Sequence, residues 1–139
     1  MRKSWDDYFF DITLAVASRS TCPRRSVGAV LIDTHSRQIL ATGYNGSPRG
    51  ANQCDDIGCY MKDGHCIRTV HAETNALLMA GPMLRQNATL YVTDTPCWHC
   101  ALSIANSGIG TVHALRPYRN NPDIYELFNQ VGITIYERD

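Results

Sequence analysis

Hydrophobic residues recur along this chain at two different spacings, and each spacing predicts one type of secondary structure. After Ser4 and Asp7, which resemble a capping box, apolar residues follow at helical intervals. The segments SVGAVLID (26–33) and QILATGYN (38–45) predict two strands around a turn at THSR. Residues 45–66 are rich in Gly, Asn and Cys and predict a long loop. A loop of this length usually carries its own stabilising feature or has a function. The helical positions are Trp5, Tyr8, Phe9, Ile12 and Val16.

The second half of the chain alternates between the two patterns. Gly81 and Pro82 end the first predicted helix, and Gly108 ends the second. Asn121 and Pro122 supply a cap and a first-turn proline for a third. The segments are helix HAETNALLMAG (71–81), strand TLYVTDT (89–95), helix WHCALSIANSG (98–108), strand TVHAL (111–115), helix DIYELFNQVG (123–132) and strand ITIYE (133–137).

The predicted order of elements is α-β-β-α-β-α-β-α-β, without a linker, a repeat or a low-complexity tract. We therefore expect one domain that spans residues 1–139. Alternation of strands and helices implies an α/β fold, in which a sheet is covered by layers of helices.

Composition narrows the possible partners. Thirteen basic and thirteen acidic side chains cancel, and no basic run stands out, so binding to long nucleic acid is not expected. No apolar run approaches the roughly 20 residues of a membrane span, so no membrane partner is expected. The apolar N-terminal stretch is interrupted by Asp6, Asp7 and Asp11, which argues against a signal peptide and predicts a cytoplasmic protein.

Six cysteines in a chain without a signal peptide favour metal binding over three disulfides. Cys97 and Cys100 form C-x-x-C at the start of a predicted helix, directly after Pro96. The amide dipoles of a helix N-terminus favour thiolates. Alone, this motif fits a redox pair, half of a structural zinc site or a coincidence.

His71 and Glu73 change that interpretation, because they also lie at a helix start. We expect parallel neighbouring βα units to bring the two helix starts to one side of the sheet. His71, Cys97 and Cys100 would then offer three zinc ligands and leave a fourth position for water, the catalytic arrangement. Residues two apart point about 200° from each other in a regular helix, so His71 must lie at the irregular entry if Glu73 is to face the same site.

H-x-E combined with P-C-x-x-C is the signature of zinc nucleobase deaminases. In that chemistry zinc lowers the pKa of bound water from 15.7 to about 7. The resulting nucleophile attacks the amidine carbon of the base. Glu73 is the residue that we expect to move protons between the water, the ring nitrogen and the departing ammonia.

Four segments resemble the deoxycytidylate (dCMP) deaminase family: SVGAVLI, GYNGSPRG, CIRTVHAETNAL and YVTDTPCWHCALSIANSGI. The resemblance extends roughly over residues 22–133. It implies a three-layer α/β/α sandwich with a central mixed five-stranded sheet. It also implies zinc-dependent hydrolysis of dCMP to dUMP and ammonia, which feeds dTMP synthesis, in a homohexamer. Activation by dCTP and inhibition by dTTP are further expectations, and Mg²⁺ would accompany such a triphosphate effector.

The resemblance also suggests substrate contacts, each with a structural alternative. Asn45 is expected near the sugar hydroxyl, although Asn-Gly also favours a hairpin turn. Tyr118 is expected near the nucleotide phosphate, or is a packing aromatic. Arg24 could pair with the phosphate through its planar fork, and Arg49 with an effector triphosphate, or both are solvated. Weaker phosphate candidates are Arg25, Arg116 and Arg119.

Four cysteines remain: Cys22, Cys54, Cys59 and Cys66. Three lie in the long loop, which lacks the apolar content to order itself. Four thiolates suit a closed structural zinc, and His65 could replace one of them. Some family members that this chain resembles carry such a second zinc. The alternative is a set of free buried thiols.

Other functions use some of the same residues. A deaminase of free cytidine, tRNA adenosine, guanine or a riboflavin precursor would share the catalytic set. A tRNA enzyme usually carries a basic face, which the neutral balance does not favour. A non-catalytic zinc module explains the ligands but not Glu73, and a thiol-disulfide enzyme would need Cys97 and Cys100 without zinc.

Overall fold

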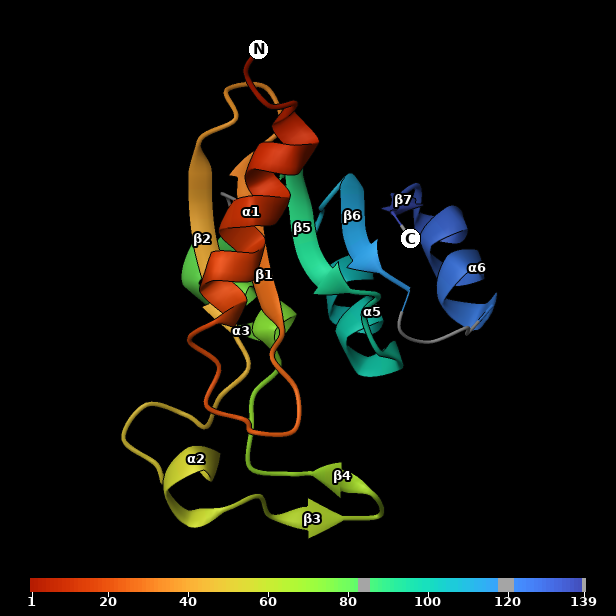
Figure 1. Ribbon diagram of the computed structural model, residues 1–139. Coiled ribbons are helices and arrows are strands. Elements are labelled where there is room, and N and C mark those ends of the chain that lie inside the picture. The colour runs from red at the N-terminus through yellow and green to blue at the C-terminus, as the bar shows by residue number, and fades with distance from the viewer. Residues whose placement is uncertain (83–85, 118–121, 139) are drawn as a thin grey trace.

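The computed structural model describes residues 1–82, 86–117 and 122–138 (Figure 1). One mixed sheet organises the chain, and a two-stranded hairpin lies apart from it at one end. The elements are α1 (Trp5–Ala17), β1 (Gly28–Asp33), β2 (Ile39–Tyr44), α2 (Cys54–Ile57), β3 (Met61–Lys62), β4 (His65–Cys66), α3 (Ala72–Ala80), β5 (Ala88–Asp94), α5 (Trp98–Ala105), β6 (Thr111–Arg116), α6 (Pro122–Val131) and β7 (Thr134–Glu137).

The five main strands lie in the order β2-β1-β5-β6-β7. β1 is antiparallel to both of its neighbours, whereas β6 and β7 follow β5 in parallel. β5 lies in the middle, and all seven of its residues are buried. A strand that is covered on both faces has no solvent side, which explains the nearly continuous run of apolar residues and threonines in ATLYVTD.

Helices cover both faces of the sheet, which confirms the expected three layers (Figure 1). On one face α1 places Phe9 and Phe10 against Val30, Ile32 and Tyr91. On the other face α3, α5 and α6 pack together over the sheet. Their buried side chains include Ala72, Ala76, Ala101, Ile104, Ile124 and Phe128.

Several sequence expectations about local structure are confirmed. The backbone N–H of Asp7 donates to Ser4 Oγ at 3.1 Å, so Ser4 caps α1. Gly81 lies at the C-cap of α3, and its φ of 76° suits a glycine. The predicted cap at Asn121 lies outside the described residues.

The route by which the two helix starts meet differs from the prediction. β2, which leads to α3, and β5, which leads to α5, run in the same direction but are not neighbours, because β1 lies between them. The expectation of neighbouring parallel βα units was therefore wrong. The carboxyl ends of β2 and β5 still lie at the same end of the sheet, because β1 is antiparallel to both.

The long loop has more regular structure than the sequence predicted. It contains α2 and the β3–β4 hairpin, and Figure 1 shows both projecting beyond the end of the sheet. Gly46 and Val70 form an isolated bridge, with N–H to O distances of 3.2 and 2.8 Å. The bridge joins the two ends of the long loop, and α3 begins directly after it. Among the described residues, no helix is both long and apolar enough to cross a bilayer.

Candidate metal and catalytic site

Three side chains predicted as metal ligands meet at the N-termini of α3 and α5. His71 Nδ1 lies 3.4 Å from Cys97 Sγ and 3.3 Å from Cys100 Sγ. The three ligand atoms all lie within 4.8 Å of one another. One imidazole and two thiols at this spacing match the donor set of a zinc site that keeps a fourth position open.

At the start of both helices, the ligand side chains make no capping hydrogen bond and remain available to a metal. His71 and Cys97 occupy the N-cap positions of α3 and α5, with extended backbone (ψ of 152° and 170°). Neither side chain makes a capping hydrogen bond to its own helix. The expectation that His71 lies at an irregular entry is therefore confirmed, and Glu73, in the first turn, lines the same cavity.

The two thiols of this cluster differ in acidity. The hydrogen bond from Cys100 lowers the pKa of Cys97 to about 3, helped by His71. The same bond, together with burial, raises the pKa of Cys100. Cys97 is thus a thiolate at neutral pH, and a thiolate is the form that binds metal.

Glu73 is a buried carboxylic acid with 4% of its surface exposed. Burial raises the pKa of Glu73 to about 7, and the nearby Cys97 and Asp94 act in the same direction. It lines a cavity of about 300 Å³ together with His71, Cys97 and Asn45. The cavity therefore combines metal ligands with a carboxyl group that is withdrawn from solvent.

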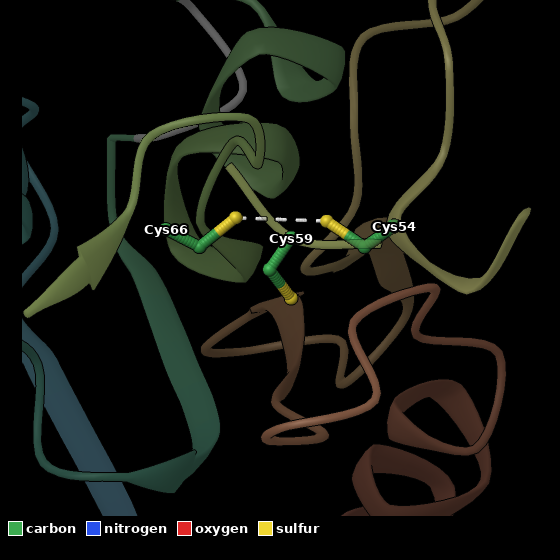
Figure 2. Close-up of side chains that lie close together, drawn as sticks. All are labelled: Cys54, Cys59 and Cys66. Atoms are coloured by element: carbon green, nitrogen blue, oxygen red, sulfur yellow. Dashed lines mark hydrogen bonds between the residues drawn. The ribbon is translucent and has the colours of Figure 1, made fainter. Parts of the chain in front are cut away.

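A second thiol cluster lies in the long loop (Figure 2). Cys54 and Cys66 point their sulfur atoms toward each other, and Cys59 lies beside them, so that all three sulfur atoms lie within 4.8 Å of one another. Cys54 Sγ and Cys66 Sγ are 3.6 Å apart. Burial raises the pKa of Cys59, and Cys22, outside this group of three, is close enough to act in the same direction. All six cysteines of the chain are free thiols.

The thiols of the second cluster also differ from one another in pKa, as those of the first cluster do. Burial raises the pKa of Cys54 to about 12. For Cys66 burial acts in the same direction, but backbone hydrogen bonds and the neighbouring thiols outweigh it and lower the pKa. One thiol of the group therefore ionises more readily than the others, and a bound cation would favour ionisation of the rest.

Gln53 fastens the start of the loop to the body of the domain. Its Oε1 accepts from Thr21 Oγ1 at 2.7 Å and from the Ser47 N–H at 3.1 Å. Its Nε2 donates to the carbonyls of Ser47 and Ala51. Thr21 lies next to Cys22, so these bonds hold Cys22 near the loop that carries the other three thiols.

The predicted substrate contacts occupy different places. Asn45 lines the cavity, and its amide group bonds to the backbone, from Nδ2 to the Arg25 carbonyl (2.8 Å) and from the Val27 N–H to Oδ1 (2.9 Å). Arg24 lines the cavity and lies 3.1 Å from Met61 Sδ. Arg49 is exposed in the loop after β2. Tyr118, Arg119 and the side chain of His65 lie outside the described residues.

Sequence reasoning missed part of the cavity wall. Asp94 and Thr95 line it, and Arg25, named only as a weak candidate, pairs with Asp94 there. Asp94 is the last residue of β5, next to the cysteine motif, and that position was the available signal. Its partners come from distant parts of the chain, so spacing alone could not reveal the contact.

Comparisons with known proteins agree with this geometry. The family model described as "Cytidine and deoxycytidylate deaminase zinc-binding region" matches residues 3–116. The chain is 44% identical over 136 residues to ComE operon protein 2 of Bacillus subtilis and covers 71% of it. It is 40% identical over 142 residues to the deoxycytidylate deaminase of Saccharomyces cerevisiae but spans only 45% of that protein. These alignments include 96% and 97% of this chain.

A phage relative and a solved structure also match most of this chain. The deoxycytidylate deaminase of Mycobacterium phage D29 is 41% identical over 122 residues, which cover 80% of this chain and 94% of that one. The crystal structure of dCMP deaminase from the cyanophage S-TIM5, in complex with dCMP and dUMP, superposes with a TM-score of 0.81. It is 26% identical and covers 99% of this chain and 98% of that one.

Proposed function

Because this chain belongs to the cytidine and deoxycytidylate deaminase family, we propose that it hydrolyses dCMP to dUMP and ammonia. One observation carries the proposal: Glu73 shares a cavity with His71 and Cys97, which together with Cys100 form a cluster of three potential metal ligands. A non-catalytic zinc module has no use for a buried carboxyl group beside its ligands. The similarity to proteins named deoxycytidylate deaminase supports dCMP as the substrate.

The donor set fits zinc. His71 can bind through Nδ1, the atom that already faces both sulfur atoms, and the Cys97 and Cys100 thiols supply the other two ligands. A neutral imidazole and two thiolates balance the charge of Zn²⁺. When bound there, zinc would supply Lewis acidity that makes a water molecule nucleophilic at neutral pH.

Glu73 is assigned the proton transfers. It takes a proton from the attacking water while the water oxygen bonds to C4 of the cytosine ring, and it delivers that proton to N3. It then carries the remaining proton of the new hydroxyl group to the amino group, as the C4–N bond breaks and the C4 carbonyl forms. The products are ammonia and the uracil ring, so one water molecule is consumed for each ammonia released.

The loop cluster is assigned a second, structural zinc. Cys54, Cys59 and Cys66 already meet, and Cys22 is the fourth ligand because it lies near Cys59 and is buried. A closed four-thiolate site would hold a loop whose two-residue strands bury little apolar surface. The cluster lies beside the cavity, because two of its members, Cys22 and Cys66, also line the cavity.

Regulation and assembly follow from family resemblance alone. We expect activation by dCTP, inhibition by dTTP, Mg²⁺ with the triphosphate and a homohexamer that supplies dUMP for dTMP synthesis. A cytoplasmic location and a single domain over residues 1–139 also stay predictions. Measurement of dCMP turnover with and without dTTP tests the regulatory part, and identical rate curves at all substrate concentrations would remove it.

The substrate test is ammonia release from dCMP, deoxycytidine, CMP and adenosine monophosphate by the zinc-loaded chain. The proposal predicts that kcat/KM is highest for dCMP. Equal activity on deoxycytidine would instead indicate a nucleoside deaminase. Turnover of adenosine nucleotides without turnover of dCMP would overturn the proposal.

A further inference from the structure

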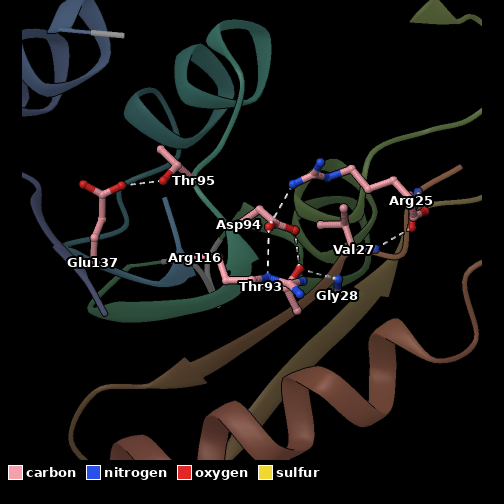
Figure 3. Close-up of polar contacts among 9 residues, drawn as sticks. Arg25, Val27, Gly28, Thr93, Asp94, Thr95, Arg116 and Glu137 are labelled. Carbon is pink, nitrogen blue, oxygen red and sulfur yellow. Dashed lines mark hydrogen bonds and ion pairs between the residues drawn. The ribbon is translucent and has the colours of Figure 1, made fainter. Parts of the chain in front are cut away.

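One carboxylate near the C-terminus is bonded to the wall of the catalytic cavity (Figure 3). Thr95 Oγ1 donates a hydrogen bond to Glu137 Oε2, although the two residues are 42 positions apart in the chain. The other carboxylate oxygen, Oε1, accepts from Tyr125 OH at 2.6 Å. Glu137, the last residue of β7, therefore joins α6 to the residue that directly follows β5.

Thr95 lies between this carboxylate and the metal ligands. It lines the cavity together with Glu73 and Cys97, and only 2% of its surface is exposed. Its backbone N–H donates to the Arg116 carbonyl at 3.1 Å, so the main chain and the side chain of Thr95 are both fixed. The next residue but one is Cys97, whose sulfur lies 3.4 Å from His71 Nδ1.

The connection between Thr95 and Cys97 is stiff. Pro96 fixes its own φ and restricts Thr95 to extended conformations. Cys97 also has an extended backbone, with φ of −72° and ψ of 170°, and it is the N-cap of α5. Because a single proline separates the two residues, the direction in which Thr95 leaves the sheet determines where the Cys97 sulfur lies.

Glu137 is itself held in place by its strand. β7 pairs in parallel with β6, where Glu137 is the register partner of Ala114, and the Arg138 N–H donates to the Ala114 carbonyl at 2.9 Å. The hydrogen bond to Glu137 raises the pKa of Tyr125 to about 12, so the phenol remains a donor at neutral pH. The carboxylate therefore reaches Thr95 from a fixed position.

A role as a counter-ion does not explain this carboxylate. Within the described residues no ion pair includes Glu137. Arg116 Nε pairs with Asp94 Oδ1 at 3.2 Å instead, and Arg25 Nη2 shares the same oxygen at 2.9 Å. Glu137 serves as the acceptor for two hydroxyl groups, and hydrogen bonds to a charged acceptor are roughly twice as strong as those between neutral groups.

We propose that Glu137 is a positioning residue of the catalytic centre: by holding Thr95, it determines where Cys97 meets His71 and Cys100. This inference rests on the proposed function. Glu137 is not among the residues that line the cavity, so it acts through Thr95 and does not touch the substrate. Residues that orient metal ligands from outside the ligand set typically change metal affinity or activity about 10- to 100-fold when they are substituted.

The test compares Glu137→Gln and Thr95→Val with the unmodified chain. Glutamine keeps the shape of the side chain without its charge, and valine keeps the branched shape of threonine without its hydroxyl. We expect both variants to lower the kcat for dCMP about 10- to 100-fold and to change KM by less than about threefold, because a ligand is misplaced while the substrate contacts stay.

The second measurement does not depend on activity. The affinity of the metal-free chain for Zn²⁺, measured by competition with a chelator, should fall about tenfold or more in both variants. The thiol cluster of the long loop is the same in every chain, so a difference between the chains reports the cluster that contains Cys97.

Matched variants separate positioning from a general structural role. Tyr125→Phe removes the other hydrogen bond of Glu137 and keeps the one to Thr95, so kcat and zinc affinity should stay nearly unchanged. Thr95→Ser keeps the hydroxyl and should retain most of both. Glu137→Gln combined with Thr95→Val should be no worse than either variant alone, because all three lose the same hydrogen bond.

Two results would overturn the inference. One is an unchanged kcat and zinc affinity in both Glu137→Gln and Thr95→Val. The other is an equal loss in Tyr125→Phe, which would indicate that the hydrogen bonds only support the packing of α6. If urea denaturation shows that Glu137→Gln does not fold, Thr95→Val decides by the same criteria. Failure of the unmodified chain to deaminate dCMP would contradict the proposed function itself, whereas the zinc affinities would still test the role of Glu137.

Discussion

Glu73 and Asp94 are two buried carboxyl groups in one cavity with opposite environments. Asp94 is paired with two guanidinium groups, which balance its negative charge. Glu73 has no arginine or lysine partner within the described residues, and burial raises its pKa. Asp94 therefore suits a permanent role in positioning the side chains paired with it, and Glu73 suits proton transfer. Environment rather than residue type therefore separates the two roles.

His113 makes stability depend on pH away from the catalytic cavity. Its ring is stacked between Tyr91 and Tyr136, with centroid distances of 4.6 and 5.0 Å. Burial lowers the pKa of His113 from its ordinary 6.5, against the opposing effect of Asp6 and with a smaller contribution from Arg138. The unfolded chain therefore binds a proton more readily than the folded one. Stability from this residue is present above pH 6.5 and is lost as the pH falls below that value.

His113→Phe should flatten that part of the stability curve, because phenylalanine keeps a flat ring but cannot be protonated. The measurement is the free energy of unfolding in urea at several pH values between about 5 and 8. His35→Phe is the matched control, since His35 is exposed in the turn before β2. An equal slope in the His113 variant and the unmodified chain would contradict the assignment.

At the scale of elements, the position of α3 relative to β2 decides where His71 and Glu73 lie. Gly43 in β2 is so close to the first turns of α3 that a Cβ there would lie 2.3 Å from the Ala72 carbonyl oxygen and 2.6 Å from the Ala76 nitrogen. These are backbone atoms, which cannot rotate away. The absence of a side chain at Gly43 therefore lets α3 pack directly against the sheet.

Gly43→Ala should displace α3 and destabilise the fold by about 1–3 kcal/mol, the usual cost of overpacking. We also expect lower turnover, because the displacement moves both His71 and Glu73. Gly110→Ala is the control, since a Cβ there would meet no described atom within 4 Å beyond its chain neighbours, and the φ of Gly110 is not positive. Urea denaturation of both variants checks the result, and equal stability would contradict the packing argument.

At the scale of the whole molecule, we propose that the long loop depends on the thiol cluster more than on packing. Its helix α2 has four residues, and each of its two strands has two. Gln53 and the Gly46–Val70 bridge fasten its two ends, but the described contacts place only Cys54 of α2 in the buried interior. A bound metal would therefore contribute a large part of the order of this loop.

Cys59→Ser should remove one of the two proposed zinc ions while the catalytic zinc stays. We expect trypsin to cut the loop at Lys62 or Arg68 about tenfold faster, because cleavage follows the population of the open form. Metal analysis and mass spectrometry of the fragments provide the measurement. Ser103→Ala on α5, an exposed substitution of similar size, is the control. An unchanged zinc content would refute the second site.

The sequence predicted those parts of the molecule that depend on local spacing. Two short motifs, His71 with Glu73 and Cys97 with Cys100, indicated both the cluster of potential metal ligands and the carboxylic acid beside it. Periodicity predicted the main strands and helices in the same way. The Arg25–Asp94–Arg116 cluster joins three distant segments, and no local pattern encodes such a meeting. The order of the strands, with β1 between β2 and β5, escaped prediction for the same reason.

The most direct test of the account is turnover of dCMP by Glu73→Gln, measured together with zinc content and thermal unfolding. Glutamine keeps the shape of the side chain but cannot carry the proton. We predict that turnover falls by about 10²- to 10⁴-fold, with zinc content and unfolding temperature unchanged. Glu126→Gln on the exposed side of α6 should have no effect. Turnover of the Glu73 variant at the rate of the unmodified chain would contradict the central claim.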